Sequence, residues 1–207
     1  MQLVLLGPPA SGKGTQGELL ASRFGIPKIS TGDMLRAARA AGTALGREAD
    51  GYMSTGRLVP DSVVIGLVAE RLTEADAERG FILDGFPRTV PQAEALESLL
   101  ERRGTPLTHV LQIDVPHDLL VERATLRRTD KRTGQIYHLK YSLPPPDAEL
   151  EHRADDREET VRRRLDEYDA MTAALLPFYG QRGLLRRVDG VGKPEEVTAR
   201  ISNELEQ

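Results

Sequence analysis

The stretch MQLVLLGPPASGKGTQ, residues 1–16, decides the fold of this chain. It opens with a short apolar run at residues 3–6, which is the pattern of one strand buried on both faces. The run stops at a glycine-rich segment with the spacing GxxxxGKGT over residues 7–15, and a segment with helical spacing follows. A strand, a glycine-rich loop and a helix in this order predict a phosphate-binding loop.

The residues of this loop suit the binding of phosphate. Glycines let backbone N–H groups turn inward around phosphate oxygens, and the helix N-terminus adds the positive end of its dipole. Lys13 adds a mobile positive charge. The hydroxyl that usually follows the lysine is replaced by Gly14 and comes one place later, at Thr15. The pattern therefore gives weaker support for direct ligation of Mg²⁺ by this hydroxyl.

Composition limits the classes of protein to which this chain can belong. A length of 207 residues indicates one domain or a domain with insertions. The net charge of −4 gives no sign of a general nucleic-acid-binding or membrane-surface protein. Without cysteine there is no thiolate ligand for zinc, and no apolar run approaches the roughly 18 residues that cross a bilayer. We expect a cytoplasmic protein without structural zinc.

Apolar strand patterns alternate with helical patterns along the chain. Strands are predicted at residues 3–6, 27–30, 81–84, 109–115 and 185–190, with helices between most of them. This alternation predicts a parallel sheet with helices on both faces. Right-handed crossovers then place the loops that follow the strands along one edge, where ligands are expected to bind.

Two segments fall outside this alternation. Residues 30–60 carry short helical patterns, beginning with the helix-start signal of Ser30 and Asp33. Residues 126–156 contain Ile136–Tyr141, which alternates well enough for a small antiparallel strand, and three consecutive prolines. We interpret the first segment as a helical excursion and the second as a small β-rich insertion.

Several polar side chains are expected at the ligand-binding edge. Asp84 ends a predicted strand beside the phosphate loop, where it is suited to holding Mg²⁺ through water. Arg88 can act as a fork for phosphate oxygens. The amide of Gln92 suits the N6/N1 edge of adenine, although spacing alone favours an exposed helix glutamine. Arg36, together with Thr31 and residues 57–59, is placed to line a pocket for a second nucleotide.

Charged residues flank the β-rich insertion. Arg123 and Arg127 are four residues apart, which predicts that they share one helix face. After the insertion, Asp156 with Glu159 predicts the start of a helix.

In that last helix, the apolar residues place three consecutive arginines differently. Arg164 lies about 60° from the centre of the apolar stripe, whereas Arg162 and Arg163 face outward. An arginine at a buried edge needs an anion. Arg164 is therefore the candidate for the site.

Together these motifs resemble the bacterial adenylate kinase family over nearly the whole chain. The most specific are STGDMLR at residues 30–36 and DGFPRT at 84–89 with Gln92; GPPASGKGT at 7–15 and DDREETVRRR at 155–164 agree with them. The resemblance implies an α/β P-loop three-layer sandwich with a five-stranded parallel sheet. The core would comprise residues 1–29, 60–125 and 157–207, with a helical nucleoside-monophosphate-binding insertion at 30–59 and a small β-rich lid at 126–156.

The resemblance also implies an activity and a set of residues. The activity is reversible Mg²⁺-dependent phosphoryl transfer from ATP to AMP, giving two ADP, by a monomer. The catalytic residues would be Lys13, Arg88, Arg123, Arg153 and Arg164. ATP would contact Ala10, Ser11, Gly12, Lys13, Gly14, Thr15, Arg127, Ile136, Tyr137 and Gly192. AMP would contact Thr31, Arg36, Arg57, Leu58, Val59, Gly85, Phe86, Pro87, Arg88, Gln92, Arg153 and Arg164.

Other functions remain open at this stage. One is a related kinase with another acceptor or donor, such as a UMP/CMP kinase or a GTP:AMP phosphotransferase, although Gln92 favours adenine as the acceptor base. Another is an ATP-binding switch that transfers no phosphoryl group. The complete set of arginines argues against the switch.

Overall fold

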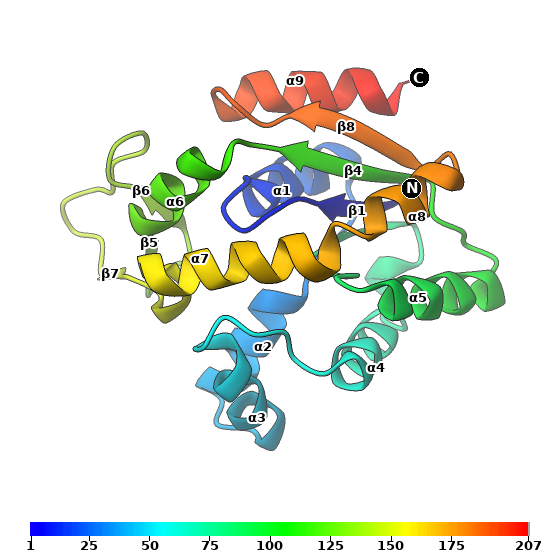
Figure 1. The fold of residues 1–207 in the computed structure, drawn as a ribbon, viewed down its shortest axis with the longest axis horizontal. Coiled ribbons are helices and arrows are strands. Elements are labelled where there is room, and N and C mark those ends of the chain that lie inside the picture. Colours follow the sequence, from blue (N-terminus) through cyan, green and yellow to red (C-terminus); the bar gives the residue numbers. More distant parts are fainter. Residues whose placement is uncertain (207) are drawn as a thin grey trace.

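The computed structural model describes residues 1–206 and contains a five-stranded parallel sheet (Figure 1). Its strands are β1 (Gln2–Leu6), β2 (Lys28–Ser30), β3 (Phe81–Asp84), β4 (His109–Asp114) and β8 (Leu185–Asp189), in the order β2-β3-β1-β4-β8. Leu5 and Ser30 both pair with Asp84, so the strands end close together at one edge. The predicted α/β fold is confirmed.

The residues of β1 alternate between two hydrophobic cores. Leu3 and Leu5 pack into one core with α1 (Lys13–Phe24), α6 (His117–Thr125), α7 (Glu158–Glu167) and α9 (Pro194–Leu205). Val4 and Leu6 pack into the other with α4 (Asp61–Arg71), α5 (Val90–Arg103) and α8 (Leu175–Gln181). The four buried positions of β1, residues 3–6, are all apolar because both faces of the strand are covered. Figure 1 shows these helices on either side of the sheet.

The segment after β2 is helical, as predicted, and lies at the bottom of Figure 1. It comprises α2 (Thr31–Ala40) and α3 (Ala44–Met53). The Ser30 hydroxyl accepts a hydrogen bond from the Asp33 N–H at 3.2 Å, which confirms the predicted start signal. The two helices pack closely, since a Cβ on Gly46 would lie 2.2 Å from the carbonyl oxygen of Ala38.

The segment after α6 forms a small antiparallel sheet, at the left of Figure 1. Its strands are β5 (Arg127–Asp130), β6 (Ile136–His138) and β7 (Leu150–Glu151). The β-rich insertion is therefore present, but the predicted strand 136–141 is too long. His138 and Ser142 exchange backbone hydrogen bonds of 2.9 and 3.0 Å, and this tight loop ends the strand.

Two predicted helix boundaries are wrong. Helix α6 ends at Thr125, so Arg127 lies on β5 and does not share a helix face with Arg123. Asp156 does not cap a helix, because it ends the 3₁₀ turn η2 (Ala154–Asp156) and Arg157 takes the N-cap position of α7. Its buried carboxylate instead pairs with Arg127. A buried carboxylate needs such a partner more than an exposed helix end needs a cap.

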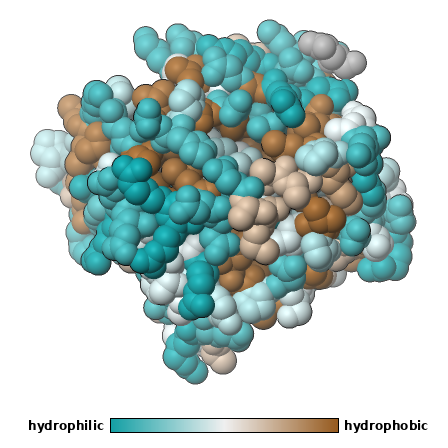
Figure 2. All heavy atoms as spheres, in the orientation of Figure 1, coloured by the Kyte–Doolittle hydropathy of each residue, from teal (hydrophilic) through white to brown (hydrophobic). Residues whose placement is uncertain are grey.

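Two further short elements complete the chain. The 3₁₀ turn η1 (Ala75–Ala77) precedes β3, and the π-helical segment η3 (Tyr168–Thr172) lies between α7 and α8. Among the described residues no helix is long and apolar enough to cross a membrane. The face in Figure 2 shows hydrophilic side chains with apolar residues in separate patches between them.

Candidate functional site

A large cavity of about 880 Å³ lies at the carboxyl edge of the parallel sheet. The phosphate loop forms its floor, and the small β5–β7 sheet, α7 and the turn at residues 190–194 form its walls. A smaller pocket of about 50 Å³ lies against α2 and the segment at residues 56–59. This edge is where open parallel sheets bind their ligands.

The phosphate loop has the conformation that anion binding requires. Helix α1 begins at Lys13, after Gly12 with φ of 100°, so its free N–H groups lie at the cavity. The Lys13 Nζ donates to the carbonyl oxygens of Gly7 and Pro8 at 2.7 and 2.8 Å. Burial lowers the pKa of Lys13 to about 8, while the Asp84 carboxylate acts in the opposite direction.

Asp84 ends β3 beside this loop. Its Oδ2 lies 3.7 Å from the position that a Cβ on Gly14 would occupy, so the carboxylate is in van der Waals range of the loop. Thr15 lines the same cavity. A carboxylate and a hydroxyl beside a phosphate-binding loop fit a Mg²⁺ ion that keeps much of its water shell. Among residues 1–206, no group of three or more His, Asp or Glu side chains is arranged to hold a structural metal.

Six arginines line the large cavity. They are Arg36, Arg88, Arg123, Arg127, Arg153 and Arg164. Burial, followed by the charge of Arg164, lowers the pKa of Arg88 to about 10, and burial with Arg36 and Arg127 lowers that of Arg153 to about 10. The guanidinium groups nevertheless stay protonated at neutral pH. The fold therefore concentrates positive charge that a polyphosphate can neutralise.

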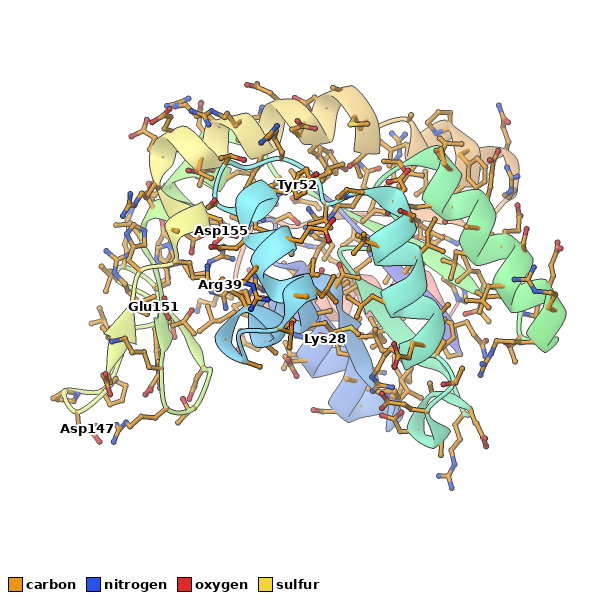
Figure 3. All side chains as sticks on the ribbon, turned by 90° about the horizontal axis from the view of Figure 1, so that it is seen from below. Lys28, Arg39, Tyr52, Asp147, Glu151 and Asp155 are labelled. Carbon is orange, nitrogen blue, oxygen red and sulfur yellow. The ribbon has the colours of Figure 1, made fainter. Side chains whose placement is uncertain are left out.

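Three of these arginines have carboxylate partners. Arg127 Nε donates to Asp156 at 2.8 Å, and Arg164 Nη1 donates to Asp155 at 2.8 Å. Arg36 pairs with Asp33 and lies 4.0 Å from Asp155. Figure 3 shows Asp155 beside the excursion helices, where the chain returns from the small sheet.

The other three arginines contact only neutral acceptors. Arg88 donates to the Gly85 carbonyl at 2.8 Å, Arg123 to the Gly190 carbonyl at 3.1 Å, and Arg153 to the Thr129 hydroxyl at 2.9 Å. Within the part of the chain that the structure describes, none of the three lies at ion-pair distance from a carboxylate. These guanidiniums are available for an anionic ligand.

The smaller pocket combines apolar walls with one buried amide. Leu35, Met53 and Val64 line it together with Gln92, whose side chain is 1% exposed. The alternative of an exposed helix glutamine is therefore wrong. Gln92 Oε1 accepts from the Arg88 N–H at 2.8 Å, and its Nε2 donates to Asp61 Oδ1 at 2.7 Å. An apolar slot with a fixed amide is suited to a flat heterocyclic base.

Comparison with known proteins identifies the family to which this geometry belongs. The family model described as adenylate kinase matches residues 5–184. A protein named adenylate kinase from Sorangium cellulosum is 63% identical over 204 residues, covering 97% of this chain and 94% of its own. Proteins of the same name from Thermodesulfovibrio yellowstonii and Archaeoglobus fulgidus are 50% and 48% identical over 214 residues, with at least 99% of both chains covered. This chain belongs to the adenylate kinase family.

The ATP-binding residues implied by the family resemblance all line the large cavity: Ala10, Ser11, Gly12, Lys13, Gly14, Thr15, Arg127, Ile136, Tyr137 and Gly192. Of the residues assigned to AMP, the smaller pocket is lined by Thr31, Arg36, Arg57, Leu58, Val59, Arg88, Gln92 and Arg164. Gly85, Pro87 and Arg153 line the large cavity. Phe86 lines neither, because its side chain is 2% exposed within the hydrophobic core.

Sequence reasoning missed several residues around this adenylate kinase site. Asp61 and Asp155 bind the side chains that were singled out, but each reads in the sequence as an ordinary acid near a helix start. His138 and Tyr141 line the large cavity from the loop after β6. The four-residue spacing of Arg123 and Arg127 led to the wrong expectation of a shared helix face. The aromatic residues His138 and Tyr141, close after Tyr137 in the sequence, could have indicated a further wall of the cavity.

Proposed function

We propose that this chain transfers the terminal phosphoryl group of ATP to AMP, giving two ADP, with ATP in the large cavity and AMP in the smaller pocket. Membership of the adenylate kinase family supports the activity. The single observation that supports the placement is the convergence of six arginines and Lys13 on the cavity that adjoins both the phosphate loop and the pocket.

In this proposal the chain's own residues position and neutralise the reacting groups. The phosphate loop and Lys13 hold the ATP phosphates, and Arg36 with Arg88 binds the AMP phosphate. Arg123, Arg153 and Arg164 surround the transferred group, whose charge is spread over several oxygens in the transition state. No general base is needed, because catalysis of this reaction rests on alignment and electrostatic stabilisation.

Mg²⁺ and closure complete the proposal. Asp84 would hold a Mg²⁺ ion through water, and the ion would neutralise phosphate charge when bound. Residues 30–59 and 126–156 would close over the nucleotides and exclude water, which otherwise competes as the acceptor. A monomer acting in the cytoplasm stays our prediction.

A coupled assay tests the proposal. Purified protein with ATP and Mg²⁺ is given AMP, UMP, CMP or GMP, and ADP formation is measured for the wild type, Arg88→Ala and Arg162→Ala. We expect transfer to AMP, a loss of about 10²–10³ in kcat/KM for Arg88→Ala, and little change for Arg162→Ala, whose exposed side chain pairs with Glu158. A preference for UMP or CMP would refute AMP as the acceptor. Binding of ATP without any transfer would favour the switch.

A further inference from the structure

We infer that Asp61 is a positioning residue that sets acceptor specificity, because it holds the Gln92 amide in the one orientation that selects adenine over 6-oxopurines. The inference rests on the proposed function, in which Gln92 faces the base of AMP. In this inference, Asp61 controls the discrimination between bases although it does not line the smaller pocket. Asp61 lies at the start of α4, and the helix that carries Gln92 begins beside it.

Three hydrogen bonds hold Asp61 and the Gln92 amide in place, and one of them joins the two side chains directly. Asp61 Oδ1 accepts from Gln92 Nε2 at 2.7 Å, and Asp61 Oδ2 accepts from the Thr89 hydroxyl at 2.9 Å. On the other side, the Arg88 N–H donates to Gln92 Oε1 at 2.8 Å. Thr89 and Gln92 are 5% and 1% exposed, so water does not replace these partners.

The partners at the two ends of the amide have opposite and fixed characters. An ionised carboxylate only accepts hydrogen bonds, and a peptide N–H only donates. Rotating the Gln92 amide by 180° would place its oxygen against the Asp61 carboxylate and its NH₂ against the Arg88 N–H. Both contacts would then be repulsive, and two buried polar groups would lose their partners. The surrounding residues therefore prevent the flip.

This constraint matters because an amide that flips freely reads two kinds of purine. In the observed orientation each end of the amide keeps one unused position, namely the second hydrogen of Nε2 and the second lone pair of Oε1. Adenine offers the complement, an acceptor at N1 and a donor at N6. Hypoxanthine and guanine offer the reverse, a donor at N1 and an acceptor at O6. An amide fixed in the observed orientation forms two hydrogen bonds with adenine. Against hypoxanthine or guanine it places donor against donor and acceptor against acceptor, so the site discriminates by repulsion.

The first test compares acceptors in the wild type. AMP, IMP and purine riboside monophosphate, which keeps the N1 acceptor and has no group at C6, are each measured as kcat/KM. We expect AMP to be the best acceptor and purine riboside monophosphate to exceed IMP, because its N1 accepts from Gln92 Nε2. An IMP value equal to or above that of purine riboside monophosphate would overturn the inference. This test needs no variant and does not depend on whether a mutant folds.

The second test removes the fixed acceptor. Asp61→Asn can present either an oxygen or an NH₂ to Gln92, so we expect the AMP-to-IMP ratio of kcat/KM to fall about tenfold, the effect of one net hydrogen bond. Asp76→Asn is the matched control, since Asp76 pairs with Arg71 at the other end of α4. The AMP-to-IMP ratio of Asp76→Asn should stay within about twofold of the wild-type ratio, since no hydrogen bond to Gln92 is lost. An unchanged ratio in Asp61→Asn would refute the inference.

A double-mutant cycle separates positioning from a structural effect. The Asp61→Asn substitution is made both in the wild-type protein and in Gln92→Ala. If Asp61 acts through the amide, the substitution lowers the AMP-to-IMP ratio of kcat/KM in the first background and leaves this ratio unchanged in the second. A change that persists in Gln92→Ala would show that Asp61 acts by another route. A wild type that does not use AMP would contradict the proposed function, whereas one that uses AMP with an unaltered ratio in Asp61→Asn contradicts only the inference.

Discussion

At the scale of single residues, the site depends on cations that the fold holds close together before any ligand binds. Burial lowers the pKa of Lys13 to about 8 and that of Arg88 to about 10. Each shift means that burying the charged form of these groups destabilises the folded protein. A polyphosphate in the cavity relieves that cost, so ligand binding and proton binding are linked.

Lys13 provides a measurable form of this linkage. In the free protein at pH 8.5, about three quarters of the Lys13 amines are deprotonated if the pKa is about 8. Phosphate oxygens favour the charged amine and raise its pKa, so protonation of Lys13 on ATP binding takes up about three quarters of a proton at this pH. Calorimetry in two buffers of different ionisation enthalpy measures this uptake. The contribution of Lys13 is the difference in uptake between the wild type and Lys13→Met. This difference should be small at pH 6.5, where the amine of the free protein is already charged.

Lys131→Met is the control for the Lys13 measurement, because Lys131 is exposed and pairs with Glu149. It should keep the proton uptake of the wild type. Equal uptake in Lys13→Met and the wild type would assign the proton to another group.

The sequence predicted the residues of this site better than their partners. The phosphate loop is encoded locally, since a strand, glycines and a lysine suffice to define it. Arg164 was assigned inward from helical spacing, and it is indeed half-buried against Asp155. The pairing of Gln92 with Asp61 spans 31 positions and depends on how α4 packs beside α5, which no local pattern states.

At the scale of elements, the loop that follows β6 shows how one side chain can organise a wall of the cavity. His138 Nδ1 accepts hydrogen bonds from the N–H groups of Lys140 and Tyr141, both at 3.2 Å. The His138 and Tyr141 rings are stacked with centroids 4.6 Å apart. Lys140 and Tyr141 each donate to Glu122 at 2.8 Å, which ties the small sheet to α6.

The same loop explains why a predicted element failed. Alternation at residues 136–141 suits a strand, but a histidine that accepts from two following N–H groups stabilises a turn instead. Likewise, Arg127 left the predicted helix face because Asp156 offers it a buried carboxylate from a distant part of the chain. Periodicity therefore predicted the types of the elements. The end of β6 and the end of α6 depend on side-chain contacts that local periodicity does not contain.

Protonation of His138 should loosen this loop and weaken ATP binding. Burial lowers the pKa of His138; the Glu122 carboxylate opposes this, while Arg123 and Lys140 add to it. The neutral ring therefore stabilises the loop above the ordinary histidine pKa, and this contribution is lost as pH falls through the lowered value. We expect the Kd for ATP to rise about three- to tenfold more in the wild type than in His138→Asn between pH 7 and pH 5.5, the scale of one or two hydrogen bonds.

His138→Asn is informative because its side-chain oxygen can accept near the position of Nδ1 but does not titrate. Protonation of ATP itself affects both proteins equally, so the comparison isolates the histidine. The Kd for AMP should show the same pH dependence in both. Parallel ATP curves for the two proteins would remove His138 from the control of the loop.

At the scale of the whole molecule, one cavity is lined by both excursions and by the edge of the parallel sheet. Arg163 Nη1 donates to the Thr55 carbonyl at 3.3 Å, and a Cβ on Gly56 would lie 3.2 Å from the Thr160 carbonyl oxygen, so the first excursion packs on α7. Arg164 of α7 donates to Asp155, which connects the second excursion to that helix. Ligands that bridge these parts should stabilise the molecule as a unit.

Thermal unfolding measures this coupling. ATP in the presence of EDTA, at about 100 times its Kd, contributes about 2.7 kcal/mol to the folded state. For a chain of this length the melting temperature should then rise by about 5–10 °C. At a fixed ATP concentration, Arg123→Ala should show a smaller rise, because Arg123 lines the cavity without a carboxylate partner and, in our proposal, binds the anion directly. Arg162→Ala, on the outer face of α7, should match the wild type. If ATP raised the melting temperature of Arg123→Ala as much as that of the wild type, the cavity arginines would not act together on the bound phosphates, and the charge that the fold concentrates there would have to serve another ligand.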